Sequence, residues 1–440
     1  MNNIFLTRPL TTRLNATNYE WAGTALQRLF NSSAPIAEVW AFFSGPQKPA
    51  VIAMDGGTPI TMEQLITTAP ETLGPRGADS ENHNQKFFFV KFLDPSDFPP
   101  FAYVGFNPEV TAPLGLEGEL FTKYFADLLW QDREALEAFA TLVRPRIASV
   151  ETFDRLKTAF KRWSIEQARH DWHADLNAAP LLECVPAEGR QAGERHLELM
   201  QRVRRHALHF MHRIDYEDDQ AILIETPTLH AIAGLSLQIH PRRPGNFFPK
   251  DELWIYKPLY DARGERLGWV LVEPQRTFDK TESCADFFTP FAWTTQGLGF
   301  RKTITREYLE TFVAMMDARA YPREHYVRRA TAVTLPEARV EGGAQWYRTV
   351  EEPAWPYFLV RELRFSGAGR SVTPLPHHSF IELHATQGTI QIALQHSGRP
   401  PLACALTPQQ PLFLPATLPY DTIEYRAEAP AQLLFFTRHA

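Results

Sequence analysis

Prolines and phenylalanines are spread along this chain of 440 residues, and together they limit the secondary structure that it can form. There are 35 prolines and 31 phenylalanines, and the prolines separate short apolar runs such as KFFFVKFL (86–93), QAILIE (220–225) and GWVLVE (268–273). Proline cannot donate a ladder hydrogen bond, so it is confined to turns, strand ends and edge strands. The pattern predicts many short strands joined by turns, as in a jelly roll or a β-sandwich.

A block of helical periodicity interrupts the strand pattern. Between residues 117 and 214, apolar side chains recur at spacings of three and four, which is the period of an amphipathic helix. We expect four or five helices in this block, with Ser149 or Thr152 capping the start of one of them. One more amphipathic helix is expected over 305–318. From about residue 335 to 440 the sequence again predicts short strands with proline-rich turns.

The order of these segments predicts the domain organisation. A chain of 440 residues is too long for a single core of ordinary size, so two or three domains are expected. We predict a mainly β protein with two jelly-roll domains and an inserted α-helical domain. The first jelly roll is expected to comprise 1–114 and 215–320, the helical insertion 115–214, and the second jelly roll 321–440.

Charge and hydropathy exclude several classes of partner. The formal net charge is −6, and no run of Lys and Arg is long enough to follow a nucleic-acid backbone. The sequence contains no stretch of about 18 consecutive apolar residues, which a membrane-spanning helix needs. The first residues lack the apolar stretch of a secretory leader. We therefore expect a cytoplasmic protein that binds neither nucleic acid nor membrane.

The three cysteines restrict the kind of metal site that the chain can form. Cys184, Cys284 and Cys404 lie far apart, so the sequence predicts neither a disulfide framework nor a thiolate zinc site. Buried packing is the expected role of each. Any metal is then expected to use histidine, glutamine and carboxylate ligands.

One stretch, HAIAGLSLQIHPRRPGNFFPKDELW, combines such ligands. Side chains two apart on a strand face the same way, so Gln238 and His240 are expected to project into one barrel interior. Turn-forming residues follow, and a hairpin is expected to place Glu252 opposite this pair. His230 lies about one strand earlier. Two imidazoles, a carboxylate and an amide form a set suited to one Zn²⁺ ion, although each pair alone is more often an ordinary polar or surface pair.

These motifs resemble a known family. LSLQIHP followed by KDELW is similar to the signature of the type I mannose-6-phosphate isomerases, members of the cupin superfamily. In that family a strand Gln-x-His and a later Lys-x-Glu supply three metal ligands and a lysine that faces the substrate. DQAILIETPTLHAIAG resembles the segment that gives the fourth ligand, and EVWAFF, KFFFVKFLD and FAYVGFNPEV resemble further family elements. The resemblance covers about residues 15–320.

The resemblance implies a function and a set of residue roles. It implies a divalent metal, Zn²⁺ above all, and isomerisation of a sugar phosphate, mannose 6-phosphate to fructose 6-phosphate or a close relative. The implied metal ligands are His230, Gln238, His240 and Glu252. The implied catalytic residues are Lys250, which binds or polarises the sugar oxygens, Glu273 as acid/base, and Arg242. Arg242, Arg243 and Lys280 are the expected phosphate partners.

The sequence also departs from the family pattern. In the family the Gln-x-His and Lys-x-Glu elements precede the His-Ala element, whereas here they follow it, and Tyr103 and Gly105 stand where an earlier ligand pair is expected. Ser283 or Glu282 stands where the family has an arginine, for which Arg242 or Arg243 is the expected substitute.

Two interpretations of the displaced motifs remain open. Either the 235–256 hairpin replaces the missing ligands from a different strand pair, or it aligns with the family's strand after the His-Ala element. In the second case only His230 remains of the metal site, which favours a non-catalytic cupin-fold sugar-binding or regulatory protein. A cupin enzyme with another reaction, such as an epimerase or a dioxygenase, is a third interpretation.

Overall fold

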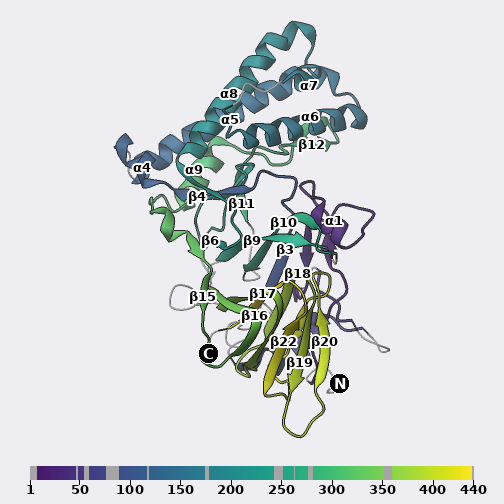
Figure 1. Ribbon diagram of the computed structural model, residues 1–440. Coiled ribbons are helices and arrows are strands. Elements are labelled where there is room, and N and C mark those ends of the chain that lie inside the picture. Colours follow the sequence, from purple (N-terminus) through teal and green to yellow (C-terminus); the bar gives the residue numbers. More distant parts are fainter. Residues whose placement is uncertain are drawn as a thin grey trace.

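The protein is arranged in three parts, with helices at one end and a large sheet at the other (Figure 1). The computed structural model describes residues 7–45, 48–53, 59–75, 89–115, 118–173, 178–241, 251–261, 263–275, 281–350 and 359–438. Between the helices and the C-terminal sheet lie two smaller sheets, and these carry the strands predicted from the sequence on both sides of the helical block.

Two antiparallel sheets form the middle part. The larger has seven strands in the order β1-β2-β3-β10-β9-β6-β14, and the smaller has five in the order β11-β8-β7-β4-β5. Their bounds are β1 Ala16–Thr17, β2 Glu38–Trp40, β3 Phe89–Leu93, β4 Phe101–Phe106, β5 Met211–Asp215, β6 Gln220–Ile224, β7 His230–Ile232, β8 Ser236–Ile239, β9 Glu252–Tyr260, β10 Arg266–Gln275, β11 Glu282–Asp286 and β14 Val327–Arg329. Side chains from both sheets meet in one core, so the two sheets face each other as in a barrel.

Four of the helices between β4 and β5 lie within the range predicted to be helical. They are α5 Gly118–Val143, α6 Val150–Arg169, α7 Ala179–Leu182 and α8 Arg190–His209. Ser149 caps α6, and its side chain and that of Thr152 form a reciprocal capping box. The helices pack on the outer face of the five-stranded sheet through a common apolar core. No helix in the described part of the chain is both long and apolar enough to cross a membrane.

Further short elements complete the middle part. α9 covers Arg306–Met315 and begins after Thr305, within the range predicted to be helical. The other elements are α1 Ala25–Leu29, α2 Met62–Thr68, α4 Pro108–Thr111, β12 Phe291–Thr294 and β13 Gly297–Phe300. Strands β12 and β13 form a two-stranded hairpin.

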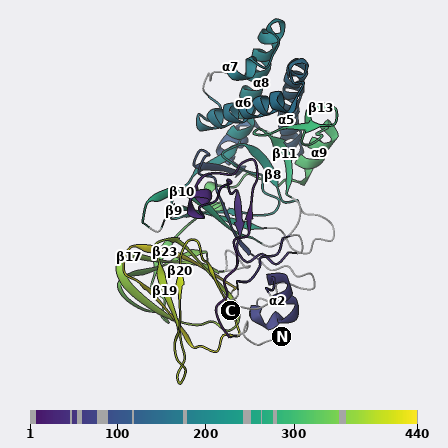
Figure 2. The same cartoon turned by 90° about the vertical axis from the view of Figure 1, so that its right-hand side faces the viewer.

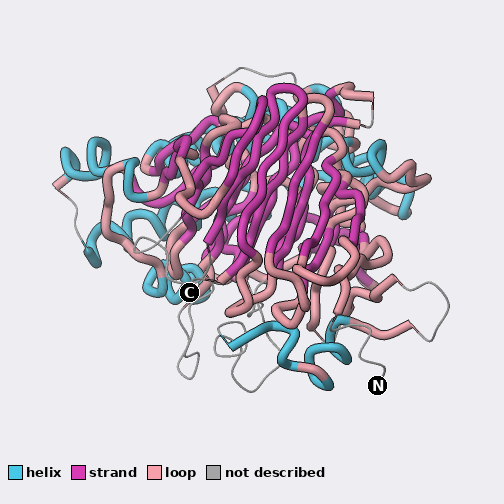
Figure 3. The backbone as a smooth tube through the Cα atoms, turned by 60° about the horizontal axis from the view of Figure 1, so that its bottom comes forward, coloured by secondary structure: helices cyan, strands magenta, loops and turns pink. Residues whose placement is uncertain are grey.

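The C-terminal part is a large antiparallel sheet with its own core. The strand order is β20-β19-β22-β17-β23-β18-β21, and β16 pairs with both β15 and β17. The bounds are β15 Thr331–Val333, β16 Arg339–Val350, β17 Leu359–Pro374, β18 Ile381–Gln387, β19 Ile390–Gln395, β20 Leu402–Leu406, β21 Leu412–Leu414, β22 Thr422–Ala427 and β23 Ala431–Thr437. Figure 2 shows this sheet curving around its core, as predicted for a second jelly roll, and Figure 3 shows its long strands side by side.

The seven-stranded sheet lies between two cores. On β9, Leu253 and Ile255 pack with Val360 and Phe436 of the C-terminal sheet, whereas Trp254 lies in the core shared with the five-stranded sheet. Alternation of side chains along the strand therefore gives the sheet one face toward the C-terminal part and one toward the barrel interior.

The predicted hairpin between the strand of Gln238 and the strand of Glu252 is wrong. β8 pairs with β7 and β11, whereas β9 pairs with β6 and β10, so the two residues lie in different sheets. The reason is that both edges of β8 are occupied, one by β11 and the other by β7 through a tight turn. Ala233 and Gly234 have φ values of 50° and 66°, and the Leu235 N–H donates to the Ile232 carbonyl. Two successive positive φ angles are typical of a hairpin turn that closes β8 onto β7.

Candidate metal centre

The β7–β8 hairpin places three polar side chains on one face of the five-stranded sheet. His230 on β7 stands directly opposite Gln238 on β8, and His240 follows two residues later. Leu237 and Ile239, on either side of Gln238 in the sequence, point to the opposite face, where they join the core beneath the helices. Residues two apart on a strand share a face, so the alternation predicted for Gln238 and His240 holds.

Glu252, at the start of β9, meets the two histidines from the facing sheet. Its Oε1 lies 3.6 Å from Nε2 of His230 and contacts Nε2 of His240. The three residues each offer a ligand atom, and these atoms lie within 4.8 Å of one another. The side chains are at most 4% exposed. Two imidazole nitrogens and a carboxylate oxygen at this spacing fit a divalent transition metal such as Zn²⁺.

Neighbouring groups orient both imidazoles. The Nδ1–H of His230 donates to the carbonyl of Thr228 at 2.9 Å, and Nδ1 of His240 lies 3.3 Å from Oγ1 of Thr281. A hydrogen bond at Nδ1 fixes the ring and leaves Nε2 as the atom that can bind a metal. Both rings therefore turn the same nitrogen toward Glu252.

These residues line a cavity of about 440 Å³ between the two sheets. Lys91 on β3 and Glu273 on β10 line the same cavity and form an ion pair of 3.0 Å. Burial lowers the pKa of Lys91, but the carboxylates of Glu273, Glu38 and Glu252 outweigh this effect and raise the pKa above its usual value. Lys91 is therefore a cation at neutral pH, held between carboxylates beside the candidate metal ligands.

The turn after β11 forms another wall of the cavity. The carboxylate of Asp286 accepts from the backbone N–H groups of Phe288 and Thr289, at 3.0 and 2.8 Å. Burial raises the pKa of Asp286, and these N–H groups partly oppose the effect. Arg301 lines the same cavity and donates to Oγ1 of Thr289 at 2.9 Å. The cavity thus contains an arginine that the sequence interpretation had not located.

The structure places the residues predicted for the site in three groups. His230, His240 and Glu252 lie together, and Glu273 lines the same cavity. Gln238 also lines it, but its amide nitrogen donates to Oγ of Ser236 at 3.2 Å. Lys250, Arg242, Arg243 and Lys280 lie outside the described residues. The metal-binding and catalytic roles stay predictions.

Sequence interpretation missed Lys91, Glu38 and Arg301. Lys91 interrupts an apolar run, and Glu38 begins EVWAFF, so each is a charged residue in a strand that otherwise reads as buried. A charged residue in an otherwise apolar strand indicates a functional or structural contact, because a buried charge requires a partner. Arg301 follows a short hairpin strand and carries no comparable signal.

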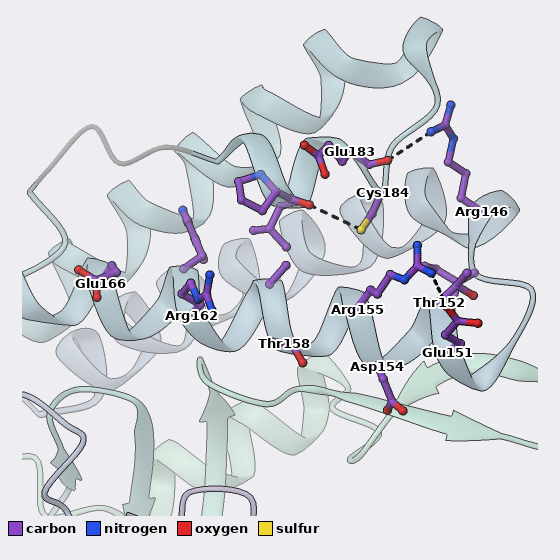
Figure 4. A pocket seen from close by; sticks show the side chains of 15 residues that line it. Arg146, Glu151, Thr152, Asp154, Arg155, Thr158, Arg162, Glu166, Glu183 and Cys184 are labelled. Carbon is purple, nitrogen blue, oxygen red and sulfur yellow. Dashed lines mark hydrogen bonds and ion pairs between the residues drawn. The ribbon is translucent and has the colours of Figure 1, made fainter.

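A larger cavity, of about 1010 Å³, lies away from the metal ligands between α6 and α7. Figure 4 shows Arg155 directed at Glu151, and Arg146 donates to the carbonyl of Glu183 at 3.2 Å. The thiol of Cys184 faces the carbonyl of Pro180. Several of these polar groups bind one another, and the described residues that line this cavity include no cluster of metal-binding side chains.

Comparison with known proteins gives a likeness in structure alone. No family model matches the chain, and no curated protein matches its sequence. Among solved structures, a point mutant of phosphomannose isomerase from Salmonella typhimurium has a TM-score of 0.50 and 11% identity, over 98% of this chain and 100% of that one. A second mutant of the same enzyme gives 0.49 and 12%, and a mannose 6-phosphate isomerase bound with zinc and yttrium gives 0.48 and 11%, with the same coverage.

This chain has a cupin-type fold. It is mainly β, with a helical domain beside a barrel-like pair of sheets, as the sequence resemblance implied. At 11% identity the likeness extends to the fold and no further. The chemistry of the cupin cavity must therefore be argued from its own residues.

Proposed function

We propose that this protein is a metal-dependent aldose–ketose isomerase acting on a sugar phosphate, mannose 6-phosphate to fructose 6-phosphate or a close relative. One observation carries the proposal: His230, His240 and Glu252 direct three ligand atoms to within 4.8 Å of one another in a cavity of small-molecule size. The Lys91–Glu273 ion pair in the same cavity supplies groups for proton transfer.

The residues of the cavity have complementary roles in this reaction. His230, His240 and Glu252, with Gln238 as a fourth ligand, would hold Zn²⁺, which when bound would supply Lewis-acid stabilisation of negative charge on a substrate oxygen. Glu273 removes the proton from C2 of the aldose and returns it to C1, while the hydroxyl proton passes from O2 to O1. Lys91 donates a hydrogen bond to the oxygen that carries negative charge in the enediolate.

Metal content tests the proposed ligands. We expect about one equivalent of zinc per chain of purified protein, measured by mass spectrometry of the elements. His240→Ala and Glu252→Gln each remove a ligand and should lower zinc content well below that of the parent. His396→Ala changes a partly exposed histidine that directly follows β19 and should leave the zinc content unchanged. Full zinc occupancy in both ligand variants contradicts the assignment.

Kinetics test the proton-transfer role. Glu273→Gln keeps the shape of the side chain but removes the base, so kcat for isomerisation should fall about 10²- to 10⁴-fold with zinc retained. The rate is measured as fructose 6-phosphate formed from mannose 6-phosphate in a coupled assay. An unchanged kcat would assign the proton transfer to another group, for which Asp286 is the first candidate.

One observation favours a second function, that of a sugar-binding or regulatory protein. Lys91 is paired with Glu273, and its pKa is raised above the usual value, so both proton-transfer groups already have a partner. A protein that binds zinc and a sugar phosphate but gives no isomerisation with any aldose phosphate tested would support this alternative.

A further inference from the structure

Three cations gather around Glu20 at the edge of the cupin cavity. Lys157 Nζ lies 2.5 Å from Oε1 of Glu20, and Arg301 Nη1 lies 3.3 Å from Oε2. Lys161 Nζ donates to the backbone carbonyl of Glu20. Both oxygens of one carboxylate are thus contacted by cations from separate parts of the chain, α6 and the segment after β13. This arrangement marks a place where one small anion can contact several cations.

The same cluster borders the cavity that holds the metal ligands. Arg301 lines this cavity, as does Trp21, the residue that follows Glu20. Lys161 lies 5.1 Å from the centre of the Phe288 ring, and Phe288 also lines the cavity. A small molecule in the cavity can therefore approach the cations on one side and the metal ligands on another.

α6 presents its two lysines on one side. Lys157 and Lys161 are four residues apart, so they lie one turn above each other. Both are half-buried, whereas Arg155 and Arg162 of the same helix line the separate cavity beside α7. The two faces of α6 therefore differ, and the lysine face contacts Glu20 and Phe288 beside the cupin cavity.

The cluster has an excess of positive charge. Lys157 and Arg301 contact the single carboxylate of Glu20, and Lys161 contacts the backbone carbonyl of the same residue. The contacts described for Lys161 are with a carbonyl and an aromatic ring, and Asp97 acts on it only at longer range. Burial lowers the pKa of Lys161, ahead of the opposing influence of Glu20 and Asp97. A half-buried cation of this kind is stabilised by a further anion.

We propose that Lys157, Lys161 and Arg301 form the subsite for the phosphate group of the substrate, and that the carboxylate of Glu20 occupies it in the unliganded protein. This inference rests on the proposed function, because it assigns the position of the phosphate group when the proposed substrate binds in the same cavity. A phosphate dianion has more oxygens and more charge than the carboxylate, so it satisfies all three cations. The helical domain then takes a direct part in substrate recognition.

Inorganic phosphate is the probe that tests the subsite. Its affinity for the zinc-loaded protein is measured by titration calorimetry, with parent and variants compared under one salt concentration. Lys157→Met and Lys161→Met each remove a charge but keep an unbranched side chain of similar length, and each should weaken binding about tenfold. Glu20→Gln removes the competing carboxylate and should strengthen binding. Arg162→Met, on the other face of α6, is the matched control and should bind phosphate like the parent.

The opposite changes in phosphate affinity expected for Glu20→Gln and for the lysine variants distinguish phosphate recognition from a purely structural role. If the lysines only held the N-terminal segment through Glu20, then Glu20→Gln would weaken binding as the lysine variants do, and the proposal would be overturned. Phosphate affinity that is absent in the parent, or unchanged in both lysine variants, also overturns it.

Sugar substrates separate this inference from the proposed function. In the lysine variants, KM for a phosphorylated sugar should rise about tenfold with kcat retained, and KM for the unphosphorylated sugar should stay unchanged. An equal rise for both sugars overturns the subsite. If no sugar is isomerised, the proposed function fails, and the calorimetric result alone decides the subsite.

Discussion

Two fully buried ionisable residues, His384 and Glu382, lie side by side on β18. Nε2 of His384 is 3.2 Å from Oε2 of Glu382, and the Phe92 ring lies 5.0 Å from the imidazole. Within the described residues, Nδ1 of His384 and Oε1 of Glu382 have no hydrogen-bond partner. Burial lowers the pKa of His384 to about 3 and raises the pKa of Glu382 well above its usual value. His384 is therefore uncharged at neutral pH, and burial shifts Glu382 toward its uncharged form.

The buried imidazole predicts a loss of stability in acid. As the pH falls below about 6.5, the unfolded chain protonates His384 while the folded chain does not until about pH 3, so the free energy of unfolding falls by up to about 1.4 kcal/mol per pH unit. His384→Leu should flatten this slope between pH 6 and 4, measured by urea unfolding. His173→Leu, at an exposed position, is the control. An unchanged slope in His384→Leu contradicts the prediction.

At the scale of elements, α6 and α8 fix one wall of the cupin cavity. Ser164 on α6 donates to the carbonyl of Phe287 at 2.6 Å, and Arg204 on α8 donates to the same carbonyl at 3.2 Å. Arg204 is fully buried and also forms an ion pair with Asp132 on α5. The neighbours of Phe287 in sequence, Asp286 and Phe288, line the cavity. The helical domain thus holds the turn that carries them.

Removing this arginine should destabilise the helical domain. Arg204→Met leaves Asp132 buried without its cation, and the free energy of unfolding should fall by about 3–5 kcal/mol, measured by urea unfolding. The double variant Arg204→Met/Asp132→Leu removes both charges and should regain most of the loss. A single variant that loses less than about 1 kcal/mol, or a double variant as unstable as the single one, would contradict the prediction.

At the scale of the whole molecule, β9 connects the cupin cavity to the C-terminal sheet. Glu252 on one face of β9 contacts the histidines, while Lys257 on the other face lies 2.8 Å from Glu362 of β17. Both members of this pair are at most 1% exposed. Burial raises the pKa of Glu362, but Lys257 and Arg364 outweigh it, so the pKa lies below its usual value. An ion pair therefore joins the two parts inside a largely apolar interface.

Breaking this ion pair should destabilise the interface between the middle part and the C-terminal sheet. Lys257→Met leaves Glu362 buried with less compensation, and the free energy of unfolding should fall by about 3–5 kcal/mol. Because the carboxylate pKa is depressed in the folded state, the contribution is present above about pH 4.5 and is lost as the pH falls further. The difference in the free energy of unfolding between parent and variant should therefore be smaller at pH 3 than at pH 7, measured by urea unfolding at both pH values.

The matched variant is Lys257→Met/Glu362→Gln, which removes the buried charge and should restore part of the stability at pH 7. Arg364 remains partly exposed and can reach water. If the difference in the free energy of unfolding between parent and Lys257→Met grows toward acid pH, the prediction is contradicted.

Local sequence patterns determined secondary-structure elements of this protein and the directions of side chains on them. Residues 150–169 have a helical period, and Ser149 stands before them with a hydroxyl that can cap their first turn, so α6 could be placed from the sequence. Strand alternation likewise placed Gln238 and His240 on one face. These features depend on neighbours within a few residues, which is why the sequence alone was sufficient.

Only the tertiary structure decided how the site is assembled. Glu252 meets His240 because two sheets face each other, not because their strands form a hairpin, and Lys91 and Arg301 enter the same cavity from distant segments. Such contacts depend on which strands pair and how the sheets pack, and strand pairing follows from turn geometry and from burial across the whole molecule. The sequence supplied the candidate ligands and their local directions, and the packing of the two sheets brought them together.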